Sequence, residues 1–381
     1  MKKLKLTLVV FLVFSVVLVT FPQVNLVNAE PNTIVVPDDY GSIQEAIDNA
    51  AEGDTVYVRK GTYNETVEID RSMSLIGEDS ETTIMVGFRL DYGNPPPVIN
   101  IKAPKVNISG FTITGSGNAG IWIEIRDINI EKSGFNITRN NIMNNGLAIR
   151  TYDVSNCIIS DNNINRNGDG IHFVGSDSTI SRNNISGNGT GEGIEVDFSQ
   201  NVTISENQIS GNKDGIYLYY IRQNEPIYIY ENNITTNNNG IRFWYDCSNS
   251  IIYKNSITSN EVGIYLENVI YTDRVGMNNQ FFTNNIVDNT QQVLIDPLSN
   301  IVSWDNGTTG NYWSDYNGTD NDGDGIGDTP YVIDQNNQDN YPLMRSVDIT
   351  TIPEFPSWTL LSLFLITSLM VMFVRHKIGG C

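Results

Sequence analysis

Cysteine, histidine and basic residues are all scarce in this chain of 381 residues. It contains three cysteines, Cys157, Cys247 and Cys381, and two histidines. No two cysteines have the spacing of a metal site, which excludes a zinc-finger type of fold. Cys157 and Cys247 lie near the starts of apolar runs that are far apart in the chain, so we expect two buried, unpaired side chains. Stability must then come from a packed core, because disulfides are not available to supply it.

Basic residues are outnumbered by acidic ones, 23 to 44, which gives a net charge of −21. Without residues 1–29 and the apolar end that starts at Ser357, 18 basic and all 44 acidic residues remain, a net charge of −26. Such a surface repels phosphate groups, so nucleic acid is not an expected partner.

Long hydrophobic runs are absent except at the two ends. Residues 1–29 have a basic start, an apolar stretch and the small-residue end Val27-Asn28-Ala29, which predicts a secretory signal peptide. The alternative is a retained membrane anchor. Ser357–Val374 is free of charge for 18 residues and is followed by Arg375 and Lys377, which predicts a transmembrane helix with its basic flank in the cytoplasm. Residues 351–381 therefore form a predicted anchor, and the rest is expected outside the cell, at its surface.

Helical periodicity is also missing from the body, where short alternating apolar runs are separated by Asn, Gly and Ser. One unit recurs every 21 to 29 residues, and each copy has an isoleucine in an N-x-I type of core: Ile113, Ile142, Ile164, Ile185, Ile209, Ile234 and Ile257. So short a unit cannot bury its own apolar face, and it must stack on copies of itself. Residues 30–300 are therefore predicted to form an all-β, right-handed parallel β-helix with ladders of isoleucine inside.

Asparagine and glycine are expected at the corners of each coil. Asparagine tolerates left-handed dihedral angles, and its side chain can form hydrogen bonds from coil to coil. The glycine before the last strand of each unit is expected to adopt a dihedral angle that other residues resist.

The N-terminal part of the body predicts a cap for the first coil. Ser42-Ile43-Gln44-Glu45 is a capping box that opens a short helix to about Ala51, with Ile43, Ala46, Ile47 and Ala50 on its apolar face. The stretch Thr33–Glu78 resembles the opening of pectin-lyase-like right-handed β-helix proteins, in particular the NosD-like parallel β-helix repeat proteins of archaeal cell surfaces. The resemblance covers roughly Thr33–Met344 and implies a fold, whereas this fold hosts lyases, hydrolases, epimerases and non-enzymes alike.

Two further expectations come from this resemblance. Pro353–Lys377 is similar to an archaeal sorting signal of the PEF type, which implies a membrane contact through the segment itself or through a lipid that replaces it. The family name implies copper, but copper sites favour clusters of His, Met or Cys, and the body has one histidine, His172. Copper is therefore not expected.

An acidic loop in residues 301–350 predicts a calcium site. Asp320, Asp322 and Asp324 alternate, Gly325 permits a tight bend, and Asp328 closes the loop, an arrangement of oxygens that suits a hard cation. The string resembles the loops of thrombospondin type 3 repeats and dockerins, which implies that the carbonyl group of Ile326 also binds the ion. It lacks the closing glutamate of an EF-hand, and a solvated acidic turn is the alternative. The segment as a whole is expected to cap the last coil through Tyr312, Trp313, Tyr331, Val332, Ile333 and Leu343.

The outer side of one strand per coil is expected to carry aromatic and charged residues, because alternate residues of a strand face opposite ways. Two outward positions per coil give Trp122 and Glu124, Ala148 and Arg150, His172 and Val174, Glu195 and Asp197, Tyr217 and Tyr219, Arg242 and Trp244, and Tyr265 and Glu267. Flat rings beside charged groups suit sugars. The predicted carbohydrate-binding residues are Trp122, Tyr217, Tyr219, Arg242, Trp244 and Tyr265. The plainer interpretation is that these residue types favour β-sheets.

The same surface offers one candidate catalytic group. Glu195 and Asp197 lie two apart on a strand, about 7 Å between their backbones, and His172 precedes Glu195 by one coil. Paired carboxylates can hydrolyse glycosides. However, the aspartates and Gly-His-Gly string of polygalacturonase-like proteins are absent, as is the Arg or Lys base of pectate-lyase-like sites. Three classes of function remain: a carbohydrate-binding or adhesion protein of the envelope, a purely structural envelope protein, and a polysaccharide lyase or glycoside hydrolase.

Nine N-x-S/T sequons are compatible with a glycosylated surface protein: Asn64, Asn107, Asn136, Asn184, Asn188, Asn201, Asn233, Asn306 and Asn317.

Overall fold

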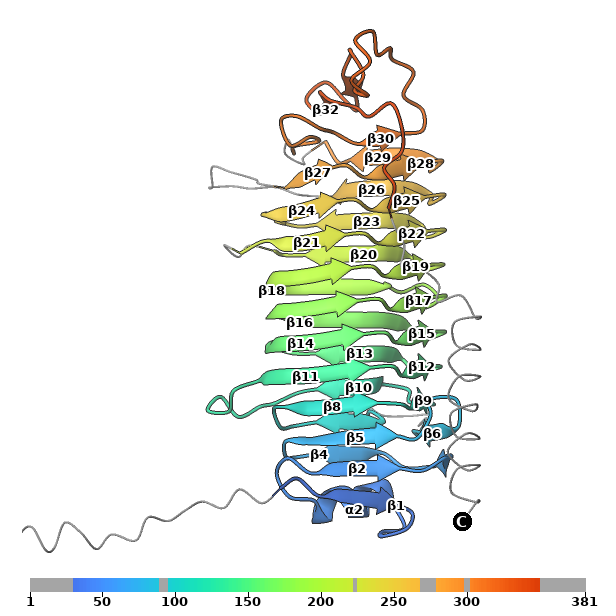
Figure 1. The fold of residues 1–381 in the computed structure, drawn as a ribbon, viewed down its shortest axis with the longest axis vertical. Coiled ribbons are helices and arrows are strands. Elements are labelled where there is room, and N and C mark those ends of the chain that lie inside the picture. The colour runs from blue at the N-terminus through green and yellow to red at the C-terminus, as the bar shows by residue number, and fades with distance from the viewer. Residues whose placement is uncertain (1–29, 89–94, 222–224, 268–278, 298–301, 350–381) are drawn as a thin grey trace, which may run out of the picture. The chain divides into compact units, whose positions relative to one another are not determined.

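The computed structural model describes residues 30–88, 95–221, 225–267, 279–297 and 302–349 (Figure 1). The predicted signal peptide and C-terminal anchor lie outside these ranges. Within them, no helix is long and apolar enough to span a membrane. All the elements described below lie in the unit Asn32–Cys381.

Residues 33–313 form a β-solenoid of the right-handed parallel type, as the sequence predicts. Each coil from β2 to β29 contributes one strand to each of three faces (Figure 1), and every pair of strands along the three faces is parallel. In the turn before β2, helix α2 takes the place of two strands. Faces I and II merge into one sheet because β16 (Asp169–Ser181) and β18 (Ile194–Ser205) run through the corner between them. Face I also contains β1 (Thr33–Val36), β2 (Thr55–Val58), β5 (Met73–Gly77), β8 (Val106–Ser109), β11 (Ser133–Thr138), β14 (Val154–Ser160), β21 (Ile227–Tyr230), β24 (Ser250–Tyr253) and β27 (Gln280–Phe282).

The other two faces complete the coils. Face II contains β4 (Val67–Ile69), β7 (Ile99–Ile101), β10 (Ala119–Ile123), β13 (Leu147–Thr151), β20 (Asp214–Tyr219), β23 (Asn239–Trp244), β26 (Val262–Glu267) and β29 (Gln291–Ile295). Face III contains β3 (Gly61–Tyr63), β6 (Thr83–Val86), β9 (Thr112–Thr114), β12 (Asn141–Met143), β15 (Asn163–Asn165), β17 (Asn184–Ser186), β19 (Gln208–Ser210), β22 (Asn233–Thr235), β25 (Ser256–Thr258), β28 (Asn285–Val287) and β30 (Tyr312–Trp313).

The isoleucine ladder is confirmed on face III. Ile113 pairs with Ile142, and the pairing continues without a slip through Ile164, Ile185, Ile209, Ile234 and Ile257. The structure extends it by Met85 at one end and Ile286 at the other. These side chains are almost completely buried, so the core is a column of aliphatic groups that neighbouring coils share.

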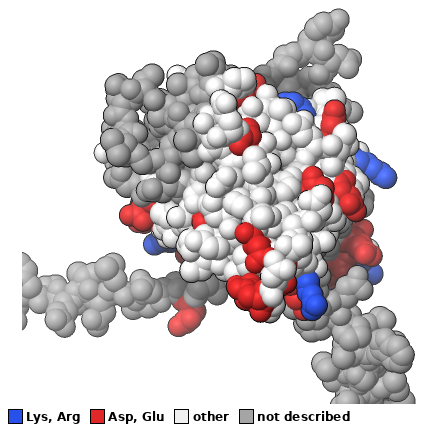
Figure 2. All heavy atoms as spheres, turned by 90° about the horizontal axis from the view of Figure 1, so that it is seen from above, with Lys and Arg blue, Asp and Glu red and all other residues white. Residues whose placement is uncertain are grey.

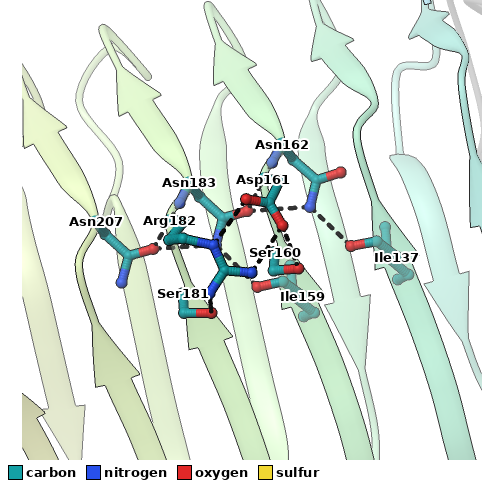
Figure 3. Close-up of polar contacts among 9 residues, drawn as sticks. All are labelled: Ile137, Ile159, Ser160, Asp161, Asn162, Ser181, Arg182, Asn183 and Asn207. Atoms are coloured by element: carbon teal, nitrogen blue, oxygen red, sulfur yellow. Dashed lines mark hydrogen bonds and ion pairs between the residues drawn. The ribbon is translucent and has the colours of Figure 1, made fainter. Parts of the chain in front are cut away.

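Two internal ladders of asparagine follow the corners of face III. Between faces I and III, the backbone N–H of each asparagine donates to the side-chain oxygen of the asparagine in the next coil, as Asn183 does to Asn207 at 3.0 Å (Figure 3). Its side-chain amide also donates backwards, as Asn183 Nδ2 does to the carbonyl of Ile159 at 2.9 Å. This first ladder comprises Asn140, Asn162, Asn183, Asn207, Asn232, Asn255, Asn284 and Asn311.

The second ladder lies between faces III and II and comprises Asn145, Asn167, Asn188, Asn212, Asn237, Asn260 and Asn289. Asn188 is completely buried in it. The sequon at Asn188 is therefore not an accessible glycosylation site in the folded chain, which corrects one of the nine.

Left-handed dihedral angles are found at the residue before each asparagine of the first ladder except Asn311, which follows Gly310. Asp161 (φ 59°) and Arg182 (φ 54°) are examples, and they form an ion pair with each other at 2.8 Å (Figure 3). The glycines at the start of the face II strands behave differently from our expectation. Gly215 and its equivalents have no positive φ; they are needed because a Cβ atom would meet the next coil, 2.6 Å from the carbonyl oxygen of Gly240 in this case.

The two ends of the solenoid are capped. Helix α2 (Ile43–Asn49) lies beside β1 and covers the first coil with Ile43, Ala46 and Ile47, all completely buried. The Ser42 hydroxyl accepts a hydrogen bond from the N–H of Glu45 at 3.2 Å, as the capping box predicts. The helix ends at Asn49, close to the predicted end.

Aromatic side chains and a buried carboxylate close the C-terminal end. Phe281, Trp304 and Trp313 continue the core, and Tyr331 stacks on Trp313 with ring centroids 4.2 Å apart. A short antiparallel pair, β31 (Tyr331–Val332) and β32 (Gln338–Asp339), holds Tyr331 and Asp339 against Trp313. Val332 is exposed, which corrects its predicted place in the cap.

Asp339 ends the first asparagine ladder. Its Oδ2 accepts hydrogen bonds from the N–H of Asn311 at 2.7 Å and from Nε1 of Trp313 at 2.9 Å, and its side chain is inaccessible to solvent. Burial raises the pKa of Asp339 to about 6. The hydrogen bonds from Asn311 and Trp313 lower the pKa, but the effect of burial is larger.

Candidate functional site

One row of side chains runs along the outer surface of face II. The backbone register aligns Trp122, Arg150, His172, Glu195, Tyr217, Arg242 and Tyr265 in consecutive coils. A second row contains Val174, Asp197, Tyr219, Trp244 and Glu267. The prediction is correct for every coil but one. The exception is Ala148, which was predicted at the first outward position of its coil. Ala148 is buried, because it occupies the position that glycine holds in the neighbouring coils. The first outward position of this coil is therefore held by Arg150.

His172, Glu195 and Asp197 meet on this surface. His172 Nε2 lies 3.1 Å from Asp197 Oδ2, and His172 Nδ1 lies 3.9 Å from Glu195 Oε2. The other carboxylate oxygen of Asp197 is buried and has no hydrogen-bond partner among the described residues. The histidine thus lies between two carboxylates, one of which is incompletely satisfied.

The protonation of this group is shifted by its surroundings. Burial raises the pKa of Glu195 to about 7, helped by the charge of Asp197 and opposed by His172. Burial lowers the pKa of His172, but the hydrogen bond with Asp197 and the charge of Glu195 outweigh it, so the pKa is raised above its usual value. Near neutral pH, the group can both donate and accept a proton.

More acidic residues surround the group. Asp169 has a raised pKa through burial and through its hydrogen bond and charge interaction with Glu192. Lys213 Nζ is 2.9 Å from Glu192 and 3.8 Å from the completely buried Asp214. The centre of face II is therefore rich in carboxylates.

Arg242 is held inside this network and is not free to bind a ligand. Its guanidinium group contacts Asp214 at 3.0 Å and donates from both Nε, at 2.9 Å, and Nη2 to one oxygen of Glu267. It also lies 5.3 Å from the ring centre of Tyr217. Tyr217 is covered by these neighbours and only 6% exposed, which corrects its predicted role as an accessible ring.

Five other aromatic rings form an exposed group, which we call the aromatic cluster: Phe198, Tyr219, Tyr220, Trp244 and Tyr245. Tyr219 is at its centre, with its ring centroid 5.2 Å from that of Trp244 and 5.6 Å from that of Phe198. Tyr220 and Tyr245 stack with an interplanar angle of 11°. Phe198, Trp244 and Tyr245 are 51%, 37% and 46% exposed, the form expected of a binding surface.

The sequence prediction included only Tyr219 and Trp244 of this cluster. Phe198, Tyr220 and Tyr245 lie at the turn where face II ends, with φ angles of 46°, 54° and 53°. The alternating pattern of a strand does not reach them. The signal for Tyr220 and Tyr245 in the sequence is the aromatic pair that Tyr219-Tyr220 and Trp244-Tyr245 form at the same place in consecutive coils, whereas Phe198 follows Asp197 and has no such signal.

A hollow of about 210 Å³ lies next to the cluster, lined by Asp153, Val154, Val174, Gly175, Ser176, Phe198 and Gln200. Val174 is paired in register with Asp197. The hollow, the carboxylates and the cluster are therefore neighbours along the axis of the coils. Trp122 and Tyr265 lie further along the same face, with Arg150 over the Trp122 ring at 4.9 Å and Arg242 at 5.6 Å from Tyr265.

The acidic loop gathers three of its predicted ligands. Carboxylate oxygens of Asp320, Asp322 and Asp324 lie within 4.8 Å of one another. Asp320 accepts hydrogen bonds from the N–H groups of Gly323 and Gly325, both at positive φ. Asp328 is not part of this group of carboxylates, and one of its oxygens accepts a hydrogen bond from the N–H of Asn321 at 2.9 Å. The N–H of Ile326 donates to Asp324 Oδ1 at 2.8 Å, and the role of its carbonyl group as a ligand stays a prediction.

The described residues do not fit a soft copper site. Cys157 and Cys247 are buried and unpaired, as predicted, and burial raises the pKa of each thiol to about 12. Apart from the acidic loop, the one cluster of possible ligands in the described part of the chain is His172 with Glu195 and Asp197, which offers a single imidazole and no sulfur.

Known proteins share this fold. No curated protein matches the chain. A structure of XylC with xylose aligns with 70% of each chain at 12% identity and a TM-score of 0.55. An alginate lyase from Paenibacillus sp. str. FPU-7 aligns with 71% of this chain and 98% of its own, at 14% identity and a TM-score of 0.51. The A-module of the mannuronan C-5 epimerase AlgE4 from Azotobacter vinelandii aligns with 72% and 90%, at 17% identity and a TM-score of 0.50.

At these identities, the likeness concerns the fold alone. The family whose description is "Periplasmic copper-binding protein (NosD)" matches residues 108–318, more than half of the sequence, and the chain therefore belongs to the NosD family.

Proposed function

We propose that the chain is a carbohydrate-binding protein that holds a polysaccharide on face II. The observation that supports this most directly is the aromatic cluster, in which five rings contact one another and three are more than a third exposed. Sugars stack on such rings through their apolar faces and leave their hydroxyl groups for hydrogen bonds with polar neighbours.

The arrangement of the cluster suits a long ligand. Its rings come from three consecutive coils, those of β18, β20 and β23, so the surface extends along the solenoid axis. The hollow beside Phe198 and the carboxylates of Glu195 and Asp197 continue this surface. Two of the similar structures, the alginate lyase and the mannuronan C-5 epimerase, are enzymes named for polysaccharides, which supports a glycan as partner.

Binding of the full chain to a glycan array tests this proposal. Trp244→Ala should remove most of the signal. Tyr253→Ala is the matched control, because Tyr253 belongs to another outward stack, with Tyr230 and Phe282 at ring distances of 5.0 and 5.4 Å, on face I. Equal binding by the wild type and the Trp244 variant would refute the proposal.

A second candidate function is acid–base cleavage of the bound glycan by Glu195, Asp197 and His172. It is favoured by the pKa of Glu195, raised to about 7 beside the Asp197 carboxylate, since such pairs divide the roles of acid and base. Depolymerisation of a bound polysaccharide that disappears in Glu195→Gln would establish it. If the polysaccharide stays intact after long incubation with the wild type, cleavage is refuted and binding is the one function that remains.

We also propose that calcium stabilises the C-terminal cap through Asp320, Asp322 and Asp324. Three carboxylates on a loop with glycines at its bends fit the ligand preferences of a hard cation. Calcium should raise the melting temperature, a chelator should reverse this, and Asp322→Ala should abolish the response. Asp348→Ala, an exposed acidic residue outside the loop, should leave the response unchanged.

Export to the cell surface completes the proposal. The apolar ends at residues 1–29 and 357–374 and the periplasmic description of the family support it, with the membrane contact made by the C-terminal segment or a lipid. Fractionation of cells checks the location. Co-purification with the envelope together with blank glycan assays would favour a structural role.

A further inference from the structure

We propose that the glycan bound on face II contains amino sugars, and that Glu195 and Asp197 bind the ammonium group of such a unit. This inference rests on the proposed carbohydrate-binding function and adds the chemical class of the ligand.

The buried oxygen of Asp197 calls for a hydrogen-bond donor. Asp197 is 8% exposed, its Oδ2 contacts His172, and its Oδ1 has no partner within the described residues. A buried carboxylate oxygen without a donor is costly, and a turn of the Asp197 carboxylate that brings this oxygen to an N–H group of the ligand gains binding free energy. An ammonium group donates up to three hydrogen bonds, whereas a carboxylate of a uronic acid donates none.

Glu195 adds a second carboxylate with little compensation. Its nearest cationic group is His172 Nδ1 at 3.9 Å, which is too far for a hydrogen bond. The other basic groups of this region are engaged: Arg242 with Asp214 and Glu267, Lys213 with Glu192, and Arg150, beside His172, with the ring of Trp122 at 4.9 Å. Two carboxylates that share one imidazole therefore favour a cationic ligand.

The carboxylates and the rings are at a spacing that one glycan chain can span. Asp197 is paired in register with Tyr219, which is paired with Trp244, so the two rings lie one and two coils away, about 5 and 10 Å at the usual strand spacing. Phe198 follows Asp197 directly. A sugar stacked on the cluster thus has its neighbour in the chain over Asp197 and Glu195.

The same charges distinguish this surface from one that binds uronates. A uronate polymer would bring its carboxylates against Glu195, Asp197 and Glu192, in a body whose net charge is −26. The alginate and mannuronan named for two structural neighbours are polymers of this kind, and we expect this chain to discriminate against them.

The test compares three sets of oligosaccharides of equal length by calorimetry with the full chain: glucosamine oligomers, their N-acetylated counterparts and mannuronate oligomers. All titrations contain a chelator, which removes divalent cations as a competing occupant of the carboxylates. We expect the glucosamine oligomers to bind about tenfold or more tightly than the N-acetylated ones, since a charge-assisted hydrogen bond is lost on acetylation. Mannuronate should bind most weakly.

Variants separate this inference from the proposed function. Glu195→Gln should bring the ratio between amino and N-acetylated sugars close to one, and Asp197→Asn should do the same. Because Glu195 has no hydrogen bond to lose within the described part, its variant is expected to fold. Glu261→Gln, which removes one exposed acidic group elsewhere, should keep the ratio.

Three results would overturn the inference: equal affinity for amino and N-acetylated sugars, tighter binding of mannuronate, or a preference that appears only without chelator. In each case, loss of binding in Trp244→Ala would still support carbohydrate binding by the cluster. If Trp244→Ala binds every oligosaccharide as the wild type does, the proposed function itself fails.

Discussion

Single glycines decide how closely consecutive coils approach on face II. Gly120, Gly170, Gly193, Gly215, Gly240 and Gly263 occupy one position in successive coils, and a Cβ on any of them would lie within 3.0 Å of an atom of a neighbouring coil. The exception, Ala148, shows that one coil accommodates a methyl group there.

The first prediction concerns this position. In Gly215→Ala, the new methyl group would lie 2.6 Å from the Gly240 oxygen and 2.8 Å from Ile234 Cγ2. We expect a loss of about 1–3 kcal/mol in the free energy of unfolding, the usual cost of overpacking. Urea denaturation measures it. Gly41→Ala, where the added Cβ meets nothing within 4 Å, is the control and should be close to neutral.

At this scale, the sequence predicts which way a side chain faces better than how far it is exposed. The alternation of β23 places Arg242 and Trp244 outside, as predicted. The burial of Tyr217 depends on Arg242 and Trp244 in the following coil, and the exposure of Phe198 and Tyr245 depends on the turns that follow the strands. Such contacts between coils are invisible in the pattern of one strand.

Asparagine ladders make each coil dependent on the next. Asn232 accepts hydrogen bonds from both the N–H and Nδ2 of Asn207, and its own amide donates to the carbonyl of Ile204 at 2.9 Å. Removing this side chain leaves several buried polar groups without partners.

We therefore predict that Asn232→Ala lowers the free energy of unfolding by at least about 3 kcal/mol, since each buried unpaired group costs about 1–3 kcal/mol. The neighbouring Asn233 faces outward and donates to Gln208 at 2.8 Å. Asn233→Ala should cost less than about 1 kcal/mol in the same denaturation experiment. Similar losses in the two variants would contradict a structural role for the ladder.

The end of the ladder predicts a pH dependence. Asp339 keeps its proton up to about pH 6 in the folded chain, whereas an unfolded aspartate loses it near its ordinary pKa of 3.8. Between these values the folded state binds more protons, so the contribution of Asp339 falls as pH rises, by on the order of 3 kcal/mol in total.

Asp339→Asn should remove this component. The measurement is the difference between wild type and variant in the urea midpoint at pH 4 and at pH 7, which cancels the other acidic groups. The wild type should lose stability relative to the variant over this interval. A constant difference would show that the buried carboxylate does not titrate in this range.

Elements were predictable where the repeat is regular and less so where it ends. The isoleucine alignment was correct in all seven units, because face III has the same length in each. The prediction for β13 was wrong because it took Gly146 as the glycine that precedes the strand. In this coil, Ala148 occupies the position that glycine holds in the others. Asp339 was missed, although it follows Asn311 by 28 residues, a spacing within the range of the repeat, because a carboxylate replaces the amide.

Acidic charge is a property of the whole chain. Figure 2 looks onto the end of the stack at the top of Figure 1, and acidic side chains there form several groups while basic ones are few. Like charges distributed over a folded body repel one another, and salt screens them.

We predict that the melting temperature rises when NaCl is increased from 20 to 300 mM. At about 0.1 M salt, the repulsion between charges more than roughly 10 Å apart is already largely screened, so the folded state is destabilised less. Scanning calorimetry measures it. KCl at equal ionic strength should have the same effect, which separates screening from binding of a particular ion. A falling melting temperature would mean that the attractive ion pairs, such as Arg182 with Asp161, outweigh the repulsion.

The equivalence of Asn183, Asn207 and Asn232 has a consequence for how such a chain changes over generations. Each receives from its predecessor and gives to its successor through the same atoms, so a gene that loses or duplicates one whole turn still encodes matching partners at the junction. The ladder begins at Asn140, which accepts from the N–H of Phe111, and it ends at Asp339, where a carboxylate takes the place of the amide. The number of coils can therefore vary while the architecture is retained. The number of outward aromatic side chains on face II varies with it.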